Sequence, residues 1–286
     1  MSNSISAEKS FYQSRYKSVK HSNYFAIYDE ILNSYKNREV KVLEIGVLNG
    51  GGLFMLRGIL GNKAKIVGVD LNPSCLRFKD FGFEILTGDQ SDPQFWGKFF
   101  RKMGKFDIII EDGGHTNNQQ IKSLNSCIGF VKDGGVYITE DVHTSYWFEF
   151  GNPSRFSYIN YAKKIIDVVN SRGPRIRPAL NNLFYKNVYS LSFYQSIVCF
   201  HVDRIKSKPS SHIQNSGKSF AHEDFRDRSL LAYPLLRLIN KSKIKLLIYV
   251  KLLILYMSYK LANIKNVTEF LYLKNRSKIQ INFKDK

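Results

Sequence analysis

A glycine-rich stretch contains the first residues whose types and spacing could do chemistry. Glu44 and Gly46 are followed by Asn49 and by three consecutive glycines that start at Gly50. Glycines allow positive φ angles and let a ligand approach the backbone where a Cβ would otherwise stand. The spacing does not fit the G-x-G-x-x-G pattern of dinucleotide-binding turns. It matches the E-x-G-x-x-x-G form of strands that bind S-adenosylmethionine (SAM). The residues predicted to hold that cofactor are Glu44, Gly46, Asn49 and Gly50.

Two acids further along the chain support this prediction. Asp70 lies 26 residues after Glu44, at the end of an apolar run, where it is placed to accept both ribose hydroxyls. Asp89, with Gln90 beside it, ends the next apolar run and is placed to meet the adenine amino group. A glycine turn alone also occurs as a structural feature of α/β proteins. Three spaced features that agree favour the cofactor site.

A second group of acids follows two later apolar runs. Asp112 comes after one run, and Glu140 and Asp141 come after the next. Carboxylates in close quarters repel one another unless they are paired or bind a cation, and oxygen-only ligands favour Mg²⁺. The three acids are therefore predicted to bind Mg²⁺, with Asp112 also lining the cofactor site. The alternative is that one or two of them cap helices or pair with lysines.

Histidines and aromatic residues beside these acids are the candidates for the reaction itself. His115 stands two glycines after Asp112, and an imidazole that titrates near neutral pH suits a general base that deprotonates a hydroxyl. His143, Tyr146 and Trp147 are predicted to line the acceptor pocket. His21 is a weaker candidate for the base, as is His143.

Alternating strand and helix patterns must position these residues. Between Val40 and Val202 they predict an α/β fold with a mostly parallel, Rossmann-like sheet that ends in an antiparallel hairpin. Ligands of such sheets collect at the carboxyl ends of the strands, where the acids lie. The expected strands are 40–46, 65–70, 83–89, 106–112 and 135–141, the hairpin is 188–194 with 196–202, and helices are expected at 54–59 and 158–170.

Four segments resemble the metal-dependent sugar O-methyltransferases of macrolide biosynthesis, the macrocin and mycinamicin type, together with rhamnosyl methyltransferase and cephalosporin-hydroxylase-like sequences. The strings are Glu111–Thr116, Tyr137–Trp147, Leu191–Val198 and the pattern Lys20-His21-x-x-Tyr24-x-x-x-Tyr28. The likeness extends from Lys20 to Val202. It implies a class I SAM-dependent methyltransferase.

The resemblance also implies residue roles. Asp112, Glu140 and Asp141 would bind Mg²⁺, and His115 would be the general base. Relatives often have Asp-Asp-Gly-Ser-His where this chain has Glu-Asp-Gly-Gly-His, so the ligand and the base are retained. The implied function is O-methylation of a sugar hydroxyl, on a bacterial surface glycan or a glycosylated metabolite.

Net charge and cysteine usage limit the setting. The chain has 286 residues and a net charge of +19, and its three cysteines show no C-x-x-C pair, which favours a reducing compartment. Because the first six residues lack the order of a signal peptide, a cytoplasmic location is expected. Most of the positive excess follows Ile205, where 13 Lys and 4 Arg face 5 acids. The predicted domains are an N-terminal helical cap at 1–39, a methyltransferase domain at 40–203 and a basic helical extension at 204–286.

The extension and the acceptor leave alternatives open. The apolar segment 246–257 is interrupted by Lys251 and is too short to span a bilayer. It could lie on an anionic membrane surface at the inner face, or pack on the domain or on a second copy in a homo-oligomer. Rival functions are a small-molecule (antibiotic or catechol-like) O-methyltransferase, a nucleic-acid methyltransferase and a non-catalytic SAM-fold partner. A nucleic-acid substrate is disfavoured because no N/D-P-P-Y/F string follows the fourth strand.

Overall fold

The computed structural model describes residues 5–150, 155–174, 176–220, 228, 230, 232–241 and 246–264. It divides into two compact units, residues 1–212 and 213–286. The domain boundary expected after residue 203 stays a prediction. Each unit is considered by itself.

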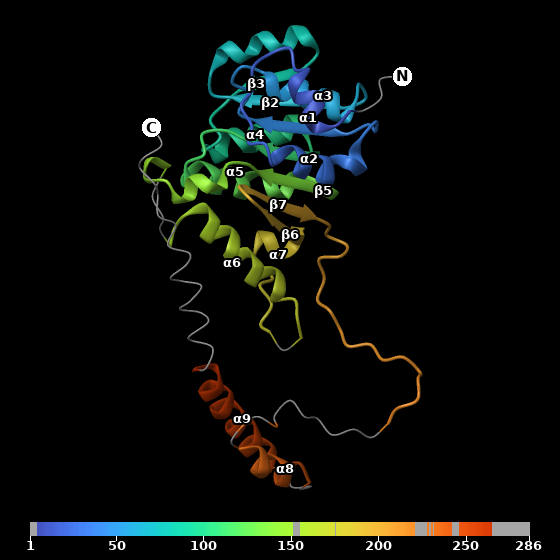
Figure 1. Cartoon of the computed structure of the whole chain (residues 1–286), viewed down its shortest axis with the longest axis vertical. Coiled ribbons are helices and arrows are strands. Elements are labelled where there is room, and N and C mark those ends of the chain that lie inside the picture. The colour runs from blue at the N-terminus through green and yellow to red at the C-terminus, as the bar shows by residue number, and fades with distance from the viewer. Residues whose placement is uncertain are drawn as a thin grey trace. The chain divides into compact units, whose positions relative to one another are not determined.

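The first unit is built on a seven-stranded sheet with the order β3-β2-β1-β4-β5-β7-β6 (Figure 1). β1 to β5 run parallel, whereas β7 is antiparallel to both β5 and β6. The predicted α/β fold, mostly parallel with a terminal antiparallel hairpin, is confirmed. The strands are β1 Lys41–Ile45, β2 Lys65–Asp70, β3 Glu84–Thr87, β4 Phe106–Glu111, β5 Val131–Thr139, β6 Val188–Tyr194 and β7 Ile197–Val202.

Helices cover both faces of this sheet, because alternate strand residues point to opposite sides. On β4, Ile108 and Ile110 join a core with α1, α2 and α3, whereas Ile109 joins a core with α4, α5 and α6. The α-helices of this unit are α1 Ala7–Tyr12, α2 Tyr24–Leu32, α3 Gly51–Leu60, α4 Pro93–Met103, α5 Asn117–Cys127, α6 Tyr158–Asn170 and α7 Leu183–Asn187. The 3-10 turns are η1 Asn33–Tyr35, η2 Pro73–Phe81, η3 Ile128–Phe130, η4 Val142–Tyr146 and η5 Phe148–Phe150.

Helix caps fix the loops at the carboxyl ends of the strands. The Thr116 side chain accepts from the Gln119 amide, and Gln119 reaches back to Thr116 in a capping box that starts α5. Asp92 caps α4, which also has a proline in its first turn. These caps start the two helices close behind the loops that follow β3 and β4, the loops that contain Gln90 and His115.

The second unit contains α8 Tyr233–Lys241 and α9 Leu246–Ile264, which contact each other. Both helices lie within the predicted basic helical extension, and residues 242–245 between them lie outside the described residues. Among the helices described, none combines the length and apolar character needed to cross a membrane.

Candidate active site

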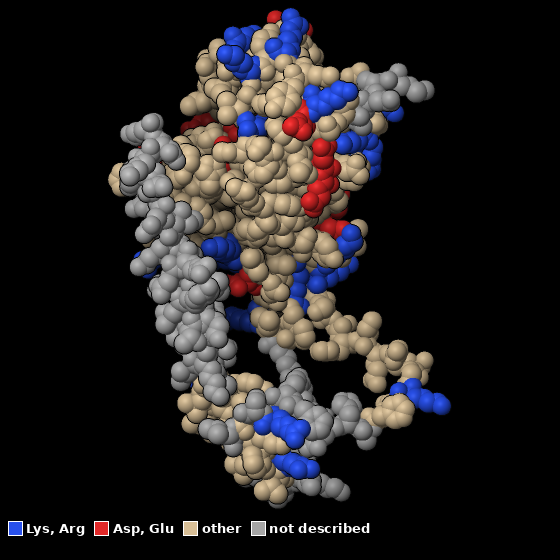
Figure 2. Space-filling model, viewed as in Figure 1, with Lys and Arg blue, Asp and Glu red and all other residues tan. Residues whose placement is uncertain are grey.

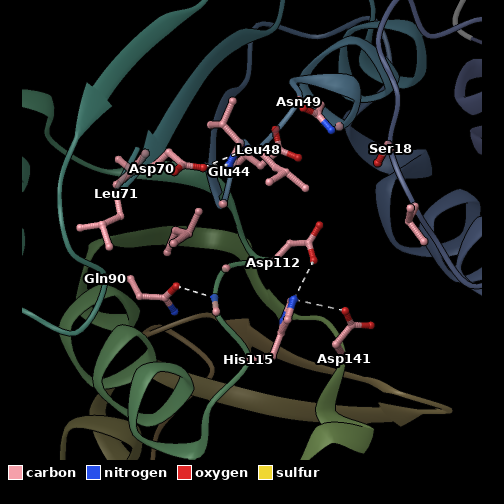
Figure 3. A pocket seen from close by; sticks show the side chains of 18 of the residues that line it. Ser18, Glu44, Leu48, Asn49, Asp70, Leu71, Gln90, Asp112, His115 and Asp141 are labelled. Carbon is pink, nitrogen blue, oxygen red and sulfur yellow. Dashed lines mark hydrogen bonds and ion pairs between the residues drawn. The ribbon is translucent and has the colours of Figure 1, made fainter. Parts of the chain in front are cut away.

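A pocket of about 450 Å³ opens at the carboxyl ends of β1, β2 and β4 (Figure 3). Its lining combines the glycine turn, the strand-end acids and a stretch of the N-terminal segment. Seven of the eight residues predicted to bind the cofactor line the pocket, and the eighth, Gly50, is the N-cap residue of α3. The seven are Glu44, Gly46, Asn49, Asp70, Asp89, Gln90 and Asp112.

The glycine turn needs its glycines for conformation and for space. Gly46 has φ +92°, and a Cβ there would lie 2.0 Å from the carbonyl oxygen of Asp112. Gly50 has φ +80°, and a Cβ there would meet the Phe78 ring at 2.4 Å. Any residue with a Cβ would have to displace the backbone after β4 at the first position, or the Phe78 ring at the second. The turn therefore keeps the ends of β1 and β4 in close contact.

Asp70 fixes the same turn through its carboxylate. Its Oδ2 accepts hydrogen bonds from the amides of Val47 at 2.8 Å and Leu48 at 2.9 Å. Its Oδ1 accepts from the amide of Asn72 at 2.8 Å. Asp70 also lines the pocket, so it could meet a ribose with its remaining lone pairs, and that role stays a prediction.

Gln90 ties the loop after β3 to the loop after β4. Its Oε1 accepts from the Gly114 amide at 2.9 Å, and its Nε2 donates to Glu111 at 2.8 Å. Asp89 accepts from the amide and hydroxyl of Ser91 at 2.7 and 2.8 Å. Both residues line the pocket. Contact of either with an adenine stays a prediction, and Gln90 positions the glycines that precede His115.

Glu44 is a buried carboxylate under the glycine turn. Its Oε2 has no hydrogen-bond partner among the described residues, and its Oε1 lies where a Cβ on Gly52 would stand. Burial raises the pKa of Glu44 well above its usual range, although Lys20 opposes the shift. A buried polar atom without a partner is costly unless a ligand or water completes it. Glu44 lines the pocket, so a cofactor with hydrogen-bond donors, such as the amino group of SAM, fits there.

Lys20 lies inside the acid cluster, where it makes the pairing with lysine that the sequence left open as an alternative to metal binding. Its ammonium donates to Asp112 and also to Glu140, the latter at 2.7 Å, and its side chain is only 2% exposed. Burial lowers the pKa of Lys20, but the two carboxylates outweigh burial and keep its pKa raised. Burial raises the pKa of Glu140 to about 7, with Asp112 adding to the shift and Lys20 opposing it. Lys20 therefore pairs with two of the three predicted Mg²⁺ ligands.

Asp141 stands at the centre of the remaining polar groups. Its backbone has φ +54°, which is uncommon for a residue with a side chain. The Tyr24 hydroxyl donates to its Oδ1 at 2.5 Å, and Nε2 of His115 lies 3.5 Å from its Oδ2. The same His115 nitrogen lies 3.9 Å from Oδ1 of Asp112.

The structure brings part of the predicted metal site together. Donor atoms of Asp112, His115 and Asp141 lie within 4.8 Å of one another. Glu140 does not join that group, because its oxygens are engaged by Lys20 and by the hydroxyl of Tyr28. A divalent cation could be held by Asp112 and Asp141 as they stand. Glu140 could join only if Lys20 moved or shared it.

His115 is held in a strained and partly buried position. It has φ +57°, and its carbonyl accepts from the Thr144 hydroxyl at 2.9 Å. Burial lowers the pKa of its imidazole below the usual value, while Asp141 opposes the shift. A lowered pKa keeps the ring neutral near pH 7, and only a neutral imidazole can accept a proton. Strained residues of this kind persist where surrounding contacts over-determine them, often at functional sites.

The three residues predicted for the acceptor lie in different surroundings. His143 stacks edge-on against Trp147 with ring centroids 4.8 Å apart, and Trp147 is 43% exposed. Tyr146 packs instead against the core that contains α4, α5 and α6. None of the three belongs to the pocket lining given above. Nδ1 of His143 lies 4.0 Å from Oδ1 of Asp141, and the roles of these three residues at the acceptor stay predictions.

The residues that sequence reasoning missed had one available signal. Tyr24 and Tyr28 are spaced by four residues, so on a helix they share one face, and Lys20 precedes them by the same interval. The structure points all three polar tips at the acids after β4 and β5. The spacing could be seen in the sequence, but not that these side chains contact the acids after β4 and β5.

Known proteins resemble about half of the chain. No family model matches it. Mycinamicin VI 2''-O-methyltransferase from Micromonospora griseorubida is 32% identical over 154 residues, which cover 50% of this chain and 38% of that protein. Demethylmacrocin O-methyltransferase from Streptomyces fradiae is 33% identical over 133 residues, covering 44% of this chain and 33% of that protein. The chain thus matches less than two fifths of the length of these relatives.

A solved structure gives the corresponding comparison in three dimensions. MycE methyltransferase from the mycinamycin biosynthetic pathway, in complex with Mg, SAH and mycinamycin VI, superposes with a TM-score of 0.65 at 25% identity. The match covers 72% of this chain and 56% of that chain.

Sheet order, glycine turn and strand-end acids together define a class I SAM-dependent methyltransferase fold. The chain is related to the macrocin and mycinamicin sugar O-methyltransferases, and it is a homologue of SAM-dependent O-methyltransferases.

Proposed function

We propose that this chain transfers a methyl group from SAM to a sugar hydroxyl of a glycosylated small molecule, assisted by a divalent cation. The observation that supports it best is the juxtaposition of His115, Asp112 and Asp141 at the edge of the pocket that contains the glycine turn (Figure 3). The turn proposed to hold the methyl donor, the imidazole proposed to accept the proton and the two carboxylates thus line the same pocket.

His115 is the proposed general base. Its Nε2 takes the proton of the attacking hydroxyl, the oxygen attacks the methyl carbon, and the carbon–sulfur bond breaks to leave S-adenosylhomocysteine. Asp141, 3.5 Å away, stabilises the imidazolium that forms. Thr144 holds the His115 backbone, so the ring is oriented before the acceptor arrives.

Asp112 and Asp141 are the proposed ligands of the cation, with Glu140 as a third if Lys20 yields it. A bound Mg²⁺ would lower the pKa of a coordinated sugar hydroxyl. Two neighbouring hydroxyls on one sugar would suit such a cation. The relative solved with Mg supports this proposal.

The acceptor sugar could belong to a glycosylated small molecule or to a surface glycan, and the comparisons favour the small molecule. The relatives named above act on mycinamicin and demethylmacrocin, which supports the small-molecule reading over a surface glycan. The surface-glycan acceptor rests on the basic extension alone.

A nucleic-acid acceptor finds less support. On the face drawn in Figure 2, basic side chains lie in separate groups with acidic ones between them. A protein surface that binds along the phosphate backbone of a nucleic acid would carry a continuous positive charge. A non-catalytic role is disfavoured because a base and carboxylates stand together at the pocket.

Labelled methyl transfer tests the proposal. We would offer labelled SAM with a panel of glycosylated macrolides and aromatic polyketides, each paired with its aglycone, in Mg²⁺ and in EDTA. We expect label on the sugar of at least one glycoside, none on any aglycone, and loss of transfer in EDTA. Label on aglycones would shift the acceptor class, and transfer indifferent to EDTA would remove the cation from the scheme.

A further inference from the structure

Two histidines converge on one oxygen of Asp141 at the edge of the pocket, where His21 and Asp141 belong to the lining and His143 does not. Nε2 of His21 lies 3.8 Å and Nδ1 of His143 lies 4.0 Å from Oδ1 of Asp141. The three donor atoms all lie within 4.8 Å of one another. Small inward movements of the exposed His21 and of the half-buried Asp141 and His143 would bring their donor atoms to the distances found around a bound ion, about 2 Å from it.

This group uses a different face of Asp141 from the one proposed for catalysis. His115 approaches Oδ2 of Asp141, whereas His21 and His143 approach Oδ1. A carboxylate can serve one cation on each oxygen, as it does in two-metal centres. His21, Asp141 and His143 thus form a second candidate cation site, which shares Asp141 with the first.

Packing holds the two rings at an angle to each other before any ion binds. Their centroids are 5.0 Å apart at 90°, His143 rests against Trp147, and His21 rests against Tyr24 at 5.2 Å. Nδ1 of His143 is buried without a hydrogen-bond partner among the described residues. A buried ring nitrogen in that state calls for a partner, and the nearest carboxylate oxygen is on Asp141.

The ligand atoms, imidazole nitrogens and a carboxylate oxygen, indicate which metal ion would bind. Two imidazoles and one carboxylate suit zinc, cobalt or nickel, while Mg²⁺ prefers oxygen ligands and keeps several waters. We propose that His21, Asp141 and His143 form a second cation site that takes a borderline divalent transition metal. Three protein ligands leave room for water as a fourth.

Loading this site has a consequence that rests on the function proposed above. Asp141 would be drawn toward the transition metal and away from His115 and Asp112. Methyl transfer should then fall when the second site fills, even in excess Mg²⁺. The binding itself does not depend on that function.

Cobalt is the probe that tests the site, because its visible absorption reports coordination. Metal-free protein, without SAM or acceptor, would be titrated with Co²⁺ as wild type and as His21→Asn, His143→Gln, His115→Asn and His212→Gln. His212 is an exposed histidine of the same unit and serves as the matched control. Far-ultraviolet circular dichroism checks that each variant is folded.

We expect wild type, His115→Asn and His212→Gln to show the Co²⁺ band. We expect His21→Asn and His143→Gln to lose at least about tenfold in affinity, since even residues behind the ligands cost that much. An unchanged affinity in His143→Gln would overturn the proposal. So would loss of the band in His115→Asn alone, because the ion would then sit at the first site. No turnover is measured, so failure of the proposed function leaves this result untouched.

Discussion

Lys20 is the residue on which the chemistry of the acid cluster depends. It balances Asp112 and Glu140 inside the protein, and a buried acid left without its partner is strongly destabilising. A divalent cation at the same acids would compete with the ammonium. Lys20 therefore links folding stability to metal binding.

Replacing Lys20 by methionine should expose that link. We expect the metal-free variant to lose about 3–5 kcal/mol of unfolding free energy, because the buried Glu140 and the half-buried Asp112 lose their shared counter-charge. We also expect Mg²⁺ or Mn²⁺ to raise its melting temperature more than it raises that of wild type. Thermal unfolding with and without the ion measures both effects.

Lys17→Met is the matched control, since Lys17 lies on the same segment and also lines the pocket. It should leave both stability and the metal response as in wild type. If Lys20→Met and Lys17→Met respond alike to the ion, Lys20 does not compete with a metal.

At this scale the sequence predicted identities better than conformations. His115, Asp112 and Asp141 were named from their positions after apolar runs, and they do stand together. The positive φ angles of His115 and Asp141 were not predictable, because they result from contacts made by Thr144 and Tyr24. The burial of Lys20 was not predictable, since burial of a charge is decided by partners distant in the chain.

The turn after β1 is the element that decides whether the cofactor fits. In Gly46→Ala the new methyl meets the backbone of Asp112, in addition to a conformational cost of about 1–2 kcal/mol. We expect SAM affinity, measured by calorimetry, to fall at least tenfold, about 1.4 kcal/mol.

Gly82→Ala separates the two causes. Gly82 also has positive φ, but a Cβ there meets nothing within 4 Å. This variant should lose stability and keep its SAM affinity. Equal losses of affinity in both variants would mean that the turn does not shape the site.

The β6–β7 hairpin should make stability depend on pH. Burial lowers the pKa of His201 on β7, with Glu30 opposing the shift, so the folded state prefers the neutral ring. Such a group contributes stability above its unfolded pKa and loses it as pH falls below that value. Between pH 7.5 and 5.5 we expect wild type to lose more unfolding free energy than His201→Gln, by denaturant titration. Parallel curves would contradict this.

Elements were predictable where apolar patterns were local. The helix at 158–170 and the strand at 188–194 have the bounds expected. β5 begins at Val131 rather than residue 135, because it pairs with β4 across a shift in register that no local pattern reveals. The helix expected from Phe54 begins at Gly51, since the glycines serve the turn and the first helical residues together. Tyr146, at the end of a short 3-10 turn, packs against the core with α4, α5 and α6, and its place at the acceptor stays a prediction.

On the scale of the molecule, the structure divides into two compact units, residues 1–212 and 213–286. All pocket-lining residues named above belong to residues 1–212. Removal of 213–286 should therefore leave SAM affinity within about twofold of the full chain, as expected when a separate compact unit is deleted. Calorimetry on both forms measures this, and a large loss would place the extension in the site.

The same truncation addresses the predicted membrane role. α9 carries exposed apolar side chains, and the extension is strongly basic. We expect the full chain to bind vesicles with anionic lipid and the truncated chain not to, with binding weakened by salt. Binding equal in both forms would assign no membrane role to the extension, and packing on a second copy would then be tested by oligomeric state.

The central claim is that His115 is the base for transfer from a SAM molecule held by the glycine turn. The most direct test is kcat in wild type and His115→Asn, with SAM affinity measured on the same samples; asparagine tolerates the positive φ at this position. We expect kcat to fall about 10²–10⁴-fold while SAM affinity is unchanged. A His115→Asn enzyme that turns over at the wild-type rate would contradict the claim.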